Sequence, residues 1–303
     1  MASWKEIKRK IKSIKNTWKI TKAMELISTV KMKKAQDLAI SKREFVLEIL
    51  KVFTRIEPFL KDMSFFKKND QWKTLAVLVT SNKGLCWGYN INVFKKVNSY
   101  IKENSNEELD YITLGKKAAW FVWRTWNNLV ADFSSSFTDN IDTMFSRNVS
   151  RTLSNDFLSW KYNKVVVFYN HYVNTIKQIP VAREFLPIEA SEIKKYLYSL
   201  VEDHYDLDKE LENKNIAWYE IEPSIEDLAK HILPMIFDMM FYDILLEAKA
   251  SEHSSRMIAM KNAKDNAAKI ASELTLVYNK ARQAAITREV SEITAWVESM
   301  KDI

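Results

Sequence analysis

The sequence predicts a mixed fold class, in which a small Rossmann-like central α/β domain is joined to a long antiparallel coiled coil made from both ends of the chain. Three observations predict it. The only glycines of the 303-residue chain, Gly84, Gly88 and Gly115, all lie in its middle. Each end places apolar residues alternately three and four apart, the spacing of a coiled coil. Between the ends, apolar runs of strand length alternate with helical stretches, which is typical of a mainly parallel sheet.

The first element is a helix from Ser3 to about Ile56, within an N-terminal shaft segment that we place at residues 1–58. Ser3 and Glu6 form a capping box, and Pro58 supplies a stop. The predicted seam comprises Trp4, Ile7, Ile11, Ile14 and Trp18, and then, with a shift of phase, Ile20, Met24, Ile27, Ala35 and Leu38. We expect one continuous helix, because neither proline nor glycine interrupts it.

We predict that the middle of the chain, residues 72–222, forms the α/β domain. Buried strands are predicted at 74–80, 111–114 and 164–169, with 176–185 as a hairpin mate of the third. Residues 133–160 are polar and are expected to form a loop and part of a helix.

The last element is a second long helix within residues 224–303, capped by Ser224. Pro234 either kinks its first turns or marks its true start. The predicted seam comprises Met260, Ala263, Ala267, Ile270, Leu274, Val277, Ala281 and Ala284. Helices of this length need a partner along the apolar stripe, so the two ends are expected to pair with each other.

The composition excludes several function classes. The positions of the three glycines match neither the phosphate-binding loop motif nor the dinucleotide-binding motif, so we expect no cofactor to be bound by this chain. Cys86 is the only cysteine, which excludes an internal disulfide and a cysteine-based zinc site. We find neither a signal-peptide core nor about 20 consecutive apolar residues, and we expect a cytoplasmic-type chain.

The charge is concentrated at one end. Residues 1–70 contain 18 lysines and arginines against 8 acidic residues, a net charge of +10, whereas the remainder has a net charge of −3. Such asymmetry points to an acidic partner or to a solvated lysine face. A basic coiled-coil scaffold that binds nucleic acid is a remote alternative, although Trp4 and Trp18 lie on the seam and not on the lysine face.

Two short segments have competing interpretations. The turn with Gly84, Cys86, Trp87 and Gly88 follows a strand, and a packed strand-to-helix turn explains it better than a nucleotide site does. Arg282 and Gln283 are adjacent, polar and off the seam. Arginine can hold a carboxylate through two parallel hydrogen bonds, so this pair is either a partner contact or simply solvated.

Both ends resemble one known family. Residues 11–26, IKSIKNTWKITKAMEL, with 31–36, KMKKAQ, resemble the amino-terminal signature of the gamma subunit of F-type ATP synthases. Residues 251–263, SEHSSRMIAMKNA, and the stretch from Glu273 to Ile293 resemble its carboxyl-terminal helix, and Ser81 to Cys86 resembles its turn after the first strand.

The resemblance implies a non-catalytic central rotary shaft that couples rotation to ATP synthesis or hydrolysis. The shaft would turn in a ring of three alpha and three beta subunits, which would hold the ATP, ADP and Mg²⁺. Arg282, Gln283 and Thr287 would contact the ring, and Lys22, Met24 and Arg256 would lie near its moving levers. The foot would meet an epsilon-like subunit and a membrane rotor ring, or a substitute for it, on the cytoplasmic side of the cell membrane.

The foot departs from the family at one position and in its composition. Trp87 stands where the family usually has glycine, and the middle of the chain is rich in aromatic residues. The alternative function is therefore a gamma-like shaft in a motor that is not coupled to proton flow, such as a motor for motility or another transport.

Overall fold

The computed structural model describes residues 4–41, 43–60, 63–67, 72–201, 222 and 224–300. Ser3 of the predicted capping box lies outside these residues. The chain divides into two compact units, one made of residues 1–29 and 256–303 and the other of residues 30–255. The domain boundaries expected from the sequence stay predictions, because two helices contribute to both units.

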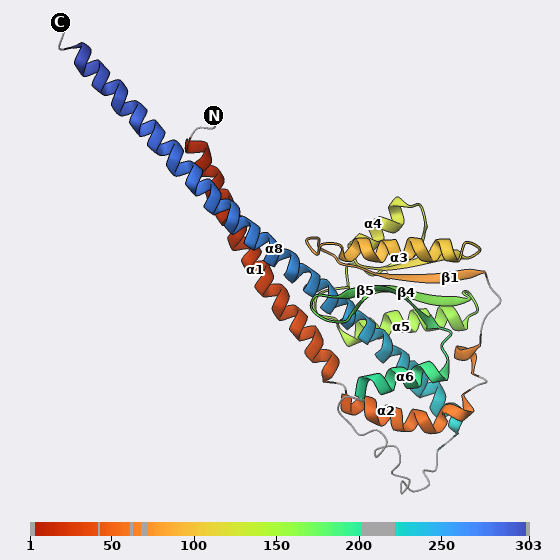
Figure 1. Ribbon diagram of the computed structural model, residues 1–303. Coiled ribbons are helices and arrows are strands. Elements are labelled where there is room, and N and C mark those ends of the chain that lie inside the picture. Colours follow the sequence, from red (N-terminus) through yellow and green to blue (C-terminus); the bar gives the residue numbers. More distant parts are fainter. Residues whose placement is uncertain are drawn as a thin grey trace. The chain divides into compact units, whose positions relative to one another are not determined.

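The elements follow one another from the N-terminus as drawn in Figure 1. The helices are α1 (Trp4–Ile40), α2 (Arg43–Ile56), α3 (Tyr89–Glu103), α4 (Lys116–Arg124), α5 (Thr143–Leu158), α6 (Ala190–Val201) and α8 (Ile225–Ser299), with short 3-10 turns at Glu57–Phe59 and Ser64–Phe66. The strands are β1 (Lys73–Val79), β2 (Glu108–Leu114), β3 (Asn128–Asp132), β4 (Lys164–Tyr172) and β5 (Gln178–Leu186).

The second unit is built on one five-stranded sheet in the order β3-β2-β1-β4-β5. Strands β1, β2, β3 and β4 pair in parallel, and β5 pairs antiparallel with β4. The predicted α/β class, the mainly parallel sheet and the hairpin mate are therefore confirmed. Strand β3 was not expected from the sequence.

Helices cover both faces of this sheet (Figure 1). Helices α3 and α4 pack one face, with Val93, Val97 and Val122 against the side chains of β1, β2 and β4. The opposite face carries the larger core, to which α2, α5, α6 and the first turns of α8 contribute. Burial of these apolar faces is the main source of the unit's stability.

The N-terminal helix is not continuous, which corrects the expectation of one helix to Ile56. Helix α1 ends at Ile40 and α2 begins at Arg43. Val46, Leu50, Phe53 and Ile56 on α2 are all buried in the core beneath the sheet. The break lets α2 take up that position, and the absence of proline and glycine concealed it.

Helix α8 is one uninterrupted element of 75 residues. The amide of Asp227 donates to the Ser224 hydroxyl over 3.1 Å, so the predicted serine cap is confirmed. Pro234 lies inside the helix and is not its start. No helix among the described residues is long and apolar enough to cross a membrane.

Candidate functional site: a two-helix seam and its exposed faces

In the first unit, α1 and α8 run antiparallel along a shared seam. The Trp4 and Tyr278 rings lie 6.2 Å apart near one end, and Lys264 Nζ lies 2.8 Å from Glu25 Oε2 further along. On α1 the buried and half-buried positions include Trp4, Ile7, Ile11, Ile14, Trp18, Thr21, Glu25 and Ser28. On α8 they include Met260, Lys264, Ala267, Ala271, Leu274, Tyr278, Ala281 and Ala285. Both series alternate steps of three and four without interruption, so the predicted coiled coil is confirmed.

Beyond Trp18 the predicted α1 seam was wrong at Ile20 and Ile27, whereas Ala35 is buried and Met24 and Leu38 are half-buried, as predicted. Ile20 and Ile27 are 60% and 53% exposed, whereas Thr21 and Ser28 occupy the seam and are buried. Thr21 tolerates burial because its hydroxyl donates to the carbonyl oxygens of Thr17 and Trp18. The heptad that begins at Trp4 therefore continues unshifted, and the polar residues Thr21, Glu25 and Ser28 fill three of its positions.

The α8 seam was predicted correctly at five of its positions and wrongly at three. Ala271, Tyr278 and Ala285 lie in the seam, whereas Ile270, Val277 and Ala284 are exposed beside it. The spacing of apolar residues did not distinguish the predicted seam from the observed one, because apolar residues occupy the positions of both.

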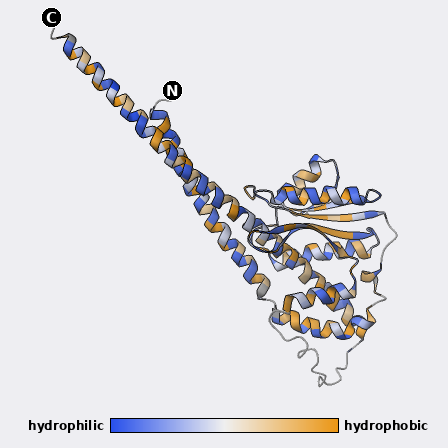
Figure 2. Ribbon diagram, in the orientation of Figure 1, coloured by the Kyte–Doolittle hydropathy of each residue, from blue (hydrophilic) through white to orange (hydrophobic). Residues whose placement is uncertain are grey.

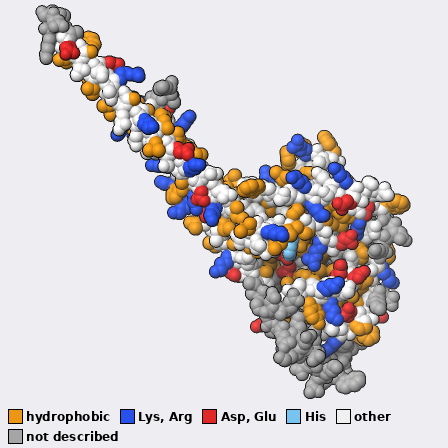
Figure 3. Space-filling view, in the orientation of Figure 1, with side chains coloured by type: hydrophobic (Ala, Val, Ile, Leu, Met, Phe, Trp, Pro, Cys, Tyr) orange, Lys and Arg blue, Asp and Glu red, His pale blue; other side chains and the backbone are white. Residues whose placement is uncertain are grey.

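The displaced residues form a second apolar stripe along the outside of the first unit. Ile20, Leu26 and Ile27 on α1 and Ile270, Leu276 and Val277 on α8 are all exposed. Figure 2 shows apolar positions recurring along both helices, and Figure 3 shows them interleaved with lysine and arginine side chains. Exposed apolar side chains that recur along a helix in a charged surround are typical of a protein-binding surface.

Beyond this two-helix stretch, the end of α8 is exposed all round. Every residue from 286 to 298 is exposed, including Ile286, Val290, Ile293 and Trp296. A lone helix gains its stability from a partner along its apolar side chains. This segment is therefore a candidate surface for binding other protein.

The predicted contact residues differ in their accessibility. Arg282, Gln283 and Thr287 are exposed on α8, as a partner contact requires. Lys22 is exposed on α1, and its ammonium nitrogen lies 5.0 Å from the centre of the Trp18 ring. Met24 is half-buried and Arg256 is buried, so these two are less accessible to a partner than the other four.

The predicted turn after β1 is closed by its own hydrogen bonds. The Ser81 amide donates to Asn90 Oδ1 over 3.0 Å, and the Tyr89 amide donates to the Cys86 carbonyl over 3.1 Å. Cys86 is buried, and Gly84 and Trp87 are exposed. Gly88 is the N-cap residue of α3. These contacts are those of a packed strand-to-helix turn.

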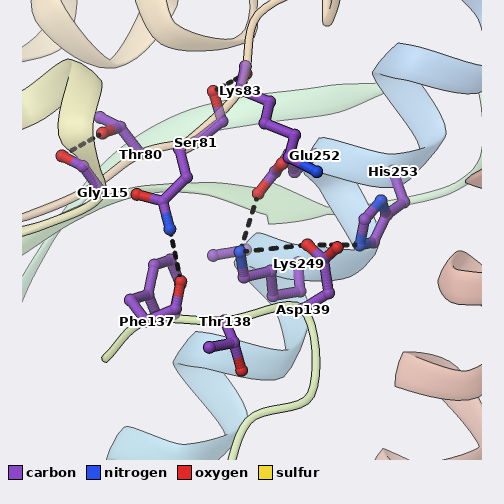
Figure 4. Close-up of polar contacts among 12 residues, drawn as sticks. Thr80, Ser81, Lys83, Gly115, Phe137, Thr138, Asp139, Lys249, Glu252 and His253 are labelled. Carbon is purple, nitrogen blue, oxygen red and sulfur yellow. Dashed lines mark hydrogen bonds and ion pairs between the residues drawn. The ribbon is translucent and has the colours of Figure 1, made fainter. Parts of the chain in front are cut away.

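A buried ionic cluster was missed by the sequence reading. Lys249 on α8 is 2% exposed, and its Nζ lies 3.1 Å from Glu252 Oε2, 3.8 Å from Asp139 Oδ1 and 4.0 Å from the Phe137 ring centre. Figure 4 shows Asp139 between Lys249 and His253, whose Nε2 lies 3.6 Å away. Lys31 of α1 completes the cluster, with its Nζ 2.5 Å from Asp139 Oδ2. Lys31 and Asp139 are 108 positions apart in the sequence, and no local sequence motif predicts that they meet.

The charges around Asp139 alter its acidity. Partial burial raises the pKa of this carboxyl, but the hydrogen bond from Lys31 and the charges of Lys249 and His253 outweigh burial and hold the pKa below its ordinary value. Asp139 is therefore a carboxylate at neutral pH, as its pairing with the lysines requires. The described residues contain no group of three or more histidine, cysteine or acidic side chains arranged to hold a metal.

Comparisons with known proteins agree along the whole chain. The family model described as ATP synthase matches residues 3–300. The ATP synthase gamma chain of Cytophaga hutchinsonii is 32% identical, with 100% of each chain covered. That of Stenotrophomonas maltophilia is 35% identical, over 97% of this chain and 98% of the relative.

Solved structures show the same fold. A chain of the Tetrahymena thermophila mitochondrial ATP synthase, from its central stalk and c-ring, superposes with a TM-score of 0.55 at 25% identity, covering 80% of this chain and 99% of that one. A chain of the Euglena gracilis mitochondrial enzyme gives a TM-score of 0.62 at 17% identity, covering 98% and 94%.

Proposed function

Because this chain belongs to the family of ATP synthase gamma chains and is the central rotary shaft of an F-type ATPase, we propose that it turns inside a ring of three alpha and three beta subunits. One copy would serve each ring. Rotation of the shaft would present different faces to the three catalytic sites in turn and so couple rotation to ATP synthesis or hydrolysis.

The exposed end of α8 is the observation that carries this proposal. Thirteen consecutive residues, 286–298, are exposed although they include five large apolar side chains: Ile286, Val290, Ile293, Trp296 and Val297. A surrounding collar of apolar side chains would cover them at every rotational position. The contact would then depend on apolar area and not on a fixed set of directional bonds, which suits a bearing.

The basic face of α1 would supply weak, exchangeable contacts. Lys8, Lys12, Lys15 and Lys19 are exposed. An exposed ion pair contributes about 0–1 kcal/mol, so each contact with an acidic lever could form and release as the shaft turns. Trp4 and Trp18 lie in the seam, so these two rings are not offered for base stacking on the lysine face of α1.

The chain is a subunit of an ATPase complex, and we infer that it is not itself catalytic. Its one loop of phosphate-loop appearance, at 81–88, is occupied by its own side-chain hydrogen bonds. ATP, ADP and Mg²⁺ would be held by the ring. The chain would associate with the cytoplasmic side of the cell membrane through the complex, in which its foot would meet an epsilon-like subunit and a membrane rotor ring.

The test uses the assembled complex. Arg282→Ala combined with Gln283→Ala removes two exposed polar contacts from the ring-facing part of α8, and we expect ATP turnover to fall several-fold while the complex keeps its subunit ratio of three, three and one. The control is Lys95→Ala on α3, which is also exposed but belongs to the second unit.

Unchanged turnover in the double variant would remove these two residues from the coupling contacts. A chain that co-purifies with nucleic acid, and never with ATPase subunits, would contradict the proposed function as a whole.

A further inference from the structure

Four non-glycine residues have a left-handed backbone among the described part of the chain. They are Leu85, Trp87, Trp126 and Trp160, with φ angles of 62°, 49°, 55° and 60°. Left-handed φ is uncommon for residues other than glycine, and it is a genuine outlier for a bulky side chain. Three of the four are tryptophan.

Two of these tryptophans end helices at the position where glycine is the usual residue. After α4, the Asn127 amide donates to the Val122 carbonyl over 3.3 Å and the Trp126 amide donates to the Trp123 carbonyl over 3.2 Å. After α5, the Lys161 amide donates to the Asp156 carbonyl over 3.3 Å and the Trp160 amide donates to the Phe157 carbonyl over 3.0 Å.

Both pairs of bonds are those of a Schellman motif, in which the residue after the C-cap must be left-handed. Thr125 and Ser159 are the C-caps, so Trp126 and Trp160 are the residues that follow. Hydrogen bonds of the helix end therefore determine the left-handed backbone at both positions. The tryptophan side chain is not its cause.

Packing of the indole rings offsets little of the backbone strain at these three tryptophans. Trp126 is 90% exposed, Trp87 is 74% exposed and Trp160 is 50% exposed. A strained backbone persists where surrounding contacts over-determine it, and a largely solvated ring offers few such contacts. Gly115 shows the contrasting case, because there φ is 114° and the residue is glycine.

The composition also suggests that tryptophan occupies positions suited to glycine. The chain has 3 glycines and 10 tryptophans. An average protein contains about 7% glycine, which for this length is roughly 21 residues. Glycine is thus scarce overall, while tryptophan occupies backbone positions that favour glycine.

We infer that positions 87, 126 and 160 are glycine positions and that the source cell inserts glycine there, by decoding as glycine a codon otherwise assigned to tryptophan. One reassigned codon explains the tryptophans at left-handed positions, and glycine at these three positions would raise the glycine count from 3 to 6. It follows that these three exposed rings are not a docking surface, and that partners of the foot meet open backbone at the three turns.

The direct test is peptide mass spectrometry of the ATPase complex purified from the source organism. We expect peptides covering positions 87, 126 and 160 to have the masses of glycine-containing sequences. Tryptophan found at any of the three positions would overturn the inference.

Thermal unfolding of the full recombinant chain tests the physical basis separately. Trp126→Gly and Trp160→Gly are each expected to raise Tm by about 2–4 °C, since glycine adopts left-handed backbone without the steric clash that a Cβ makes. Trp126→Ala removes the same ring but keeps a Cβ, and should raise Tm less. Trp120→Gly, inside α4, should lower Tm, because glycine weakens a helix interior.

If Trp126→Gly and Trp160→Gly lower Tm as Trp120→Gly does, the backbone argument fails. The proposed shaft function does not depend on this inference, because none of the three positions lies in the first unit.

Discussion

At the scale of single residues, the ionic cluster around Lys249 concentrates more charge in the interior than any feature predicted from the sequence. Lys249 and Glu252 are both almost fully buried, and Asp139 joins them from the loop before α5. Two buried charges are tolerated only while each satisfies the other. The cluster therefore joins the last turns of α1, the loop and α8 within the second unit, since Lys31 also bonds to Asp139.

We predict that Glu252→Gln lowers the free energy of unfolding by about 3 kcal/mol, because it leaves the Lys249 ammonium buried without its nearest carboxylate. The double variant Lys249→Met with Glu252→Gln removes both charges and should recover part of that loss. Urea unfolding of the full chain measures both variants. Additive losses in the double variant would show that the two side chains do not stabilise each other.

Asp139 makes the stability of the second unit depend on acidity. Its pKa is lower in the folded state than in the unfolded state, so its stabilisation is complete above the unfolded pKa and is lost as the pH falls through the folded pKa. We expect wild-type stability to fall below about pH 4, and to fall less steeply in Asp139→Asn. Denaturant unfolding at several pH values measures the difference. Parallel curves for the two proteins would contradict the assignment.

His171 makes stability depend on pH in the direction opposite to that of Asp139. A hydrogen bond to Glu247 over 2.8 Å raises the pKa of this imidazole above its ordinary value, more than partial burial lowers it. Its stabilisation is therefore complete below about pH 6.5 and is lost as the pH rises through the folded pKa. We expect an NMR titration to give His171 a pKa above 6.5, and Glu247→Gln to lower it. An unchanged titration in that variant would exclude Glu247 as the cause.

At the scale of elements, periodicity predicted which segments are helices and strands better than it predicted which face each helix buries. The three inner strands, β2, β1 and β4, were predicted because their apolar runs are continuous, and β5 was predicted as the hairpin mate of β4. Strand β3 was missed because it is a short edge strand, and its position depends on pairing with β2 and on the bond from Asn128 to Asp110. The seam phase was missed because a buried threonine that bonds its own helix leaves no apolar signal.

The two faces of α1 differ in what they stabilise, and a matched pair of substitutions separates them. Ile7 is buried in the seam, whereas Ile27 is exposed on the second stripe. We predict that Ile7→Ala lowers the stability of the isolated chain by about 2 kcal/mol, and that Ile27→Ala changes it by less than about 0.5 kcal/mol.

In the assembled complex, Ile27→Ala should have the larger effect of the two substitutions. Ile27→Ala would weaken retention of the shaft in the ring, which a salt-wash assay of subunit dissociation measures. Equal losses of isolated-chain stability in the two variants would contradict the assigned seam.

At the scale of the whole molecule, the family match constrains the foot as well as the shaft. The ATP synthase family model extends over residues 3–300, and the relatives are matched along nearly their full length. The residues that resemble the family lie mainly at the two ends, and the middle resembles it only at the turn from Ser81 to Cys86. The foot looked divergent chiefly through Trp87 and the other aromatic residues, and three of those tryptophans occupy left-handed backbone that favours glycine.

A proton-coupled motor and a motor with another load differ in one measurable outcome. The case for another load depended on a divergent foot, and that case weakens if positions 87, 126 and 160 are glycine. We therefore predict that inverted membrane vesicles carrying the intact complex acidify on addition of ATP, and that an inhibitor of the membrane ring abolishes the acidification. Vesicles that hydrolyse ATP at the same rate without acidifying would favour the other load. Arg282→Ala with Gln283→Ala should lower turnover and pumping together, because a shaft transmits to its load only the rotation that the ring imparts.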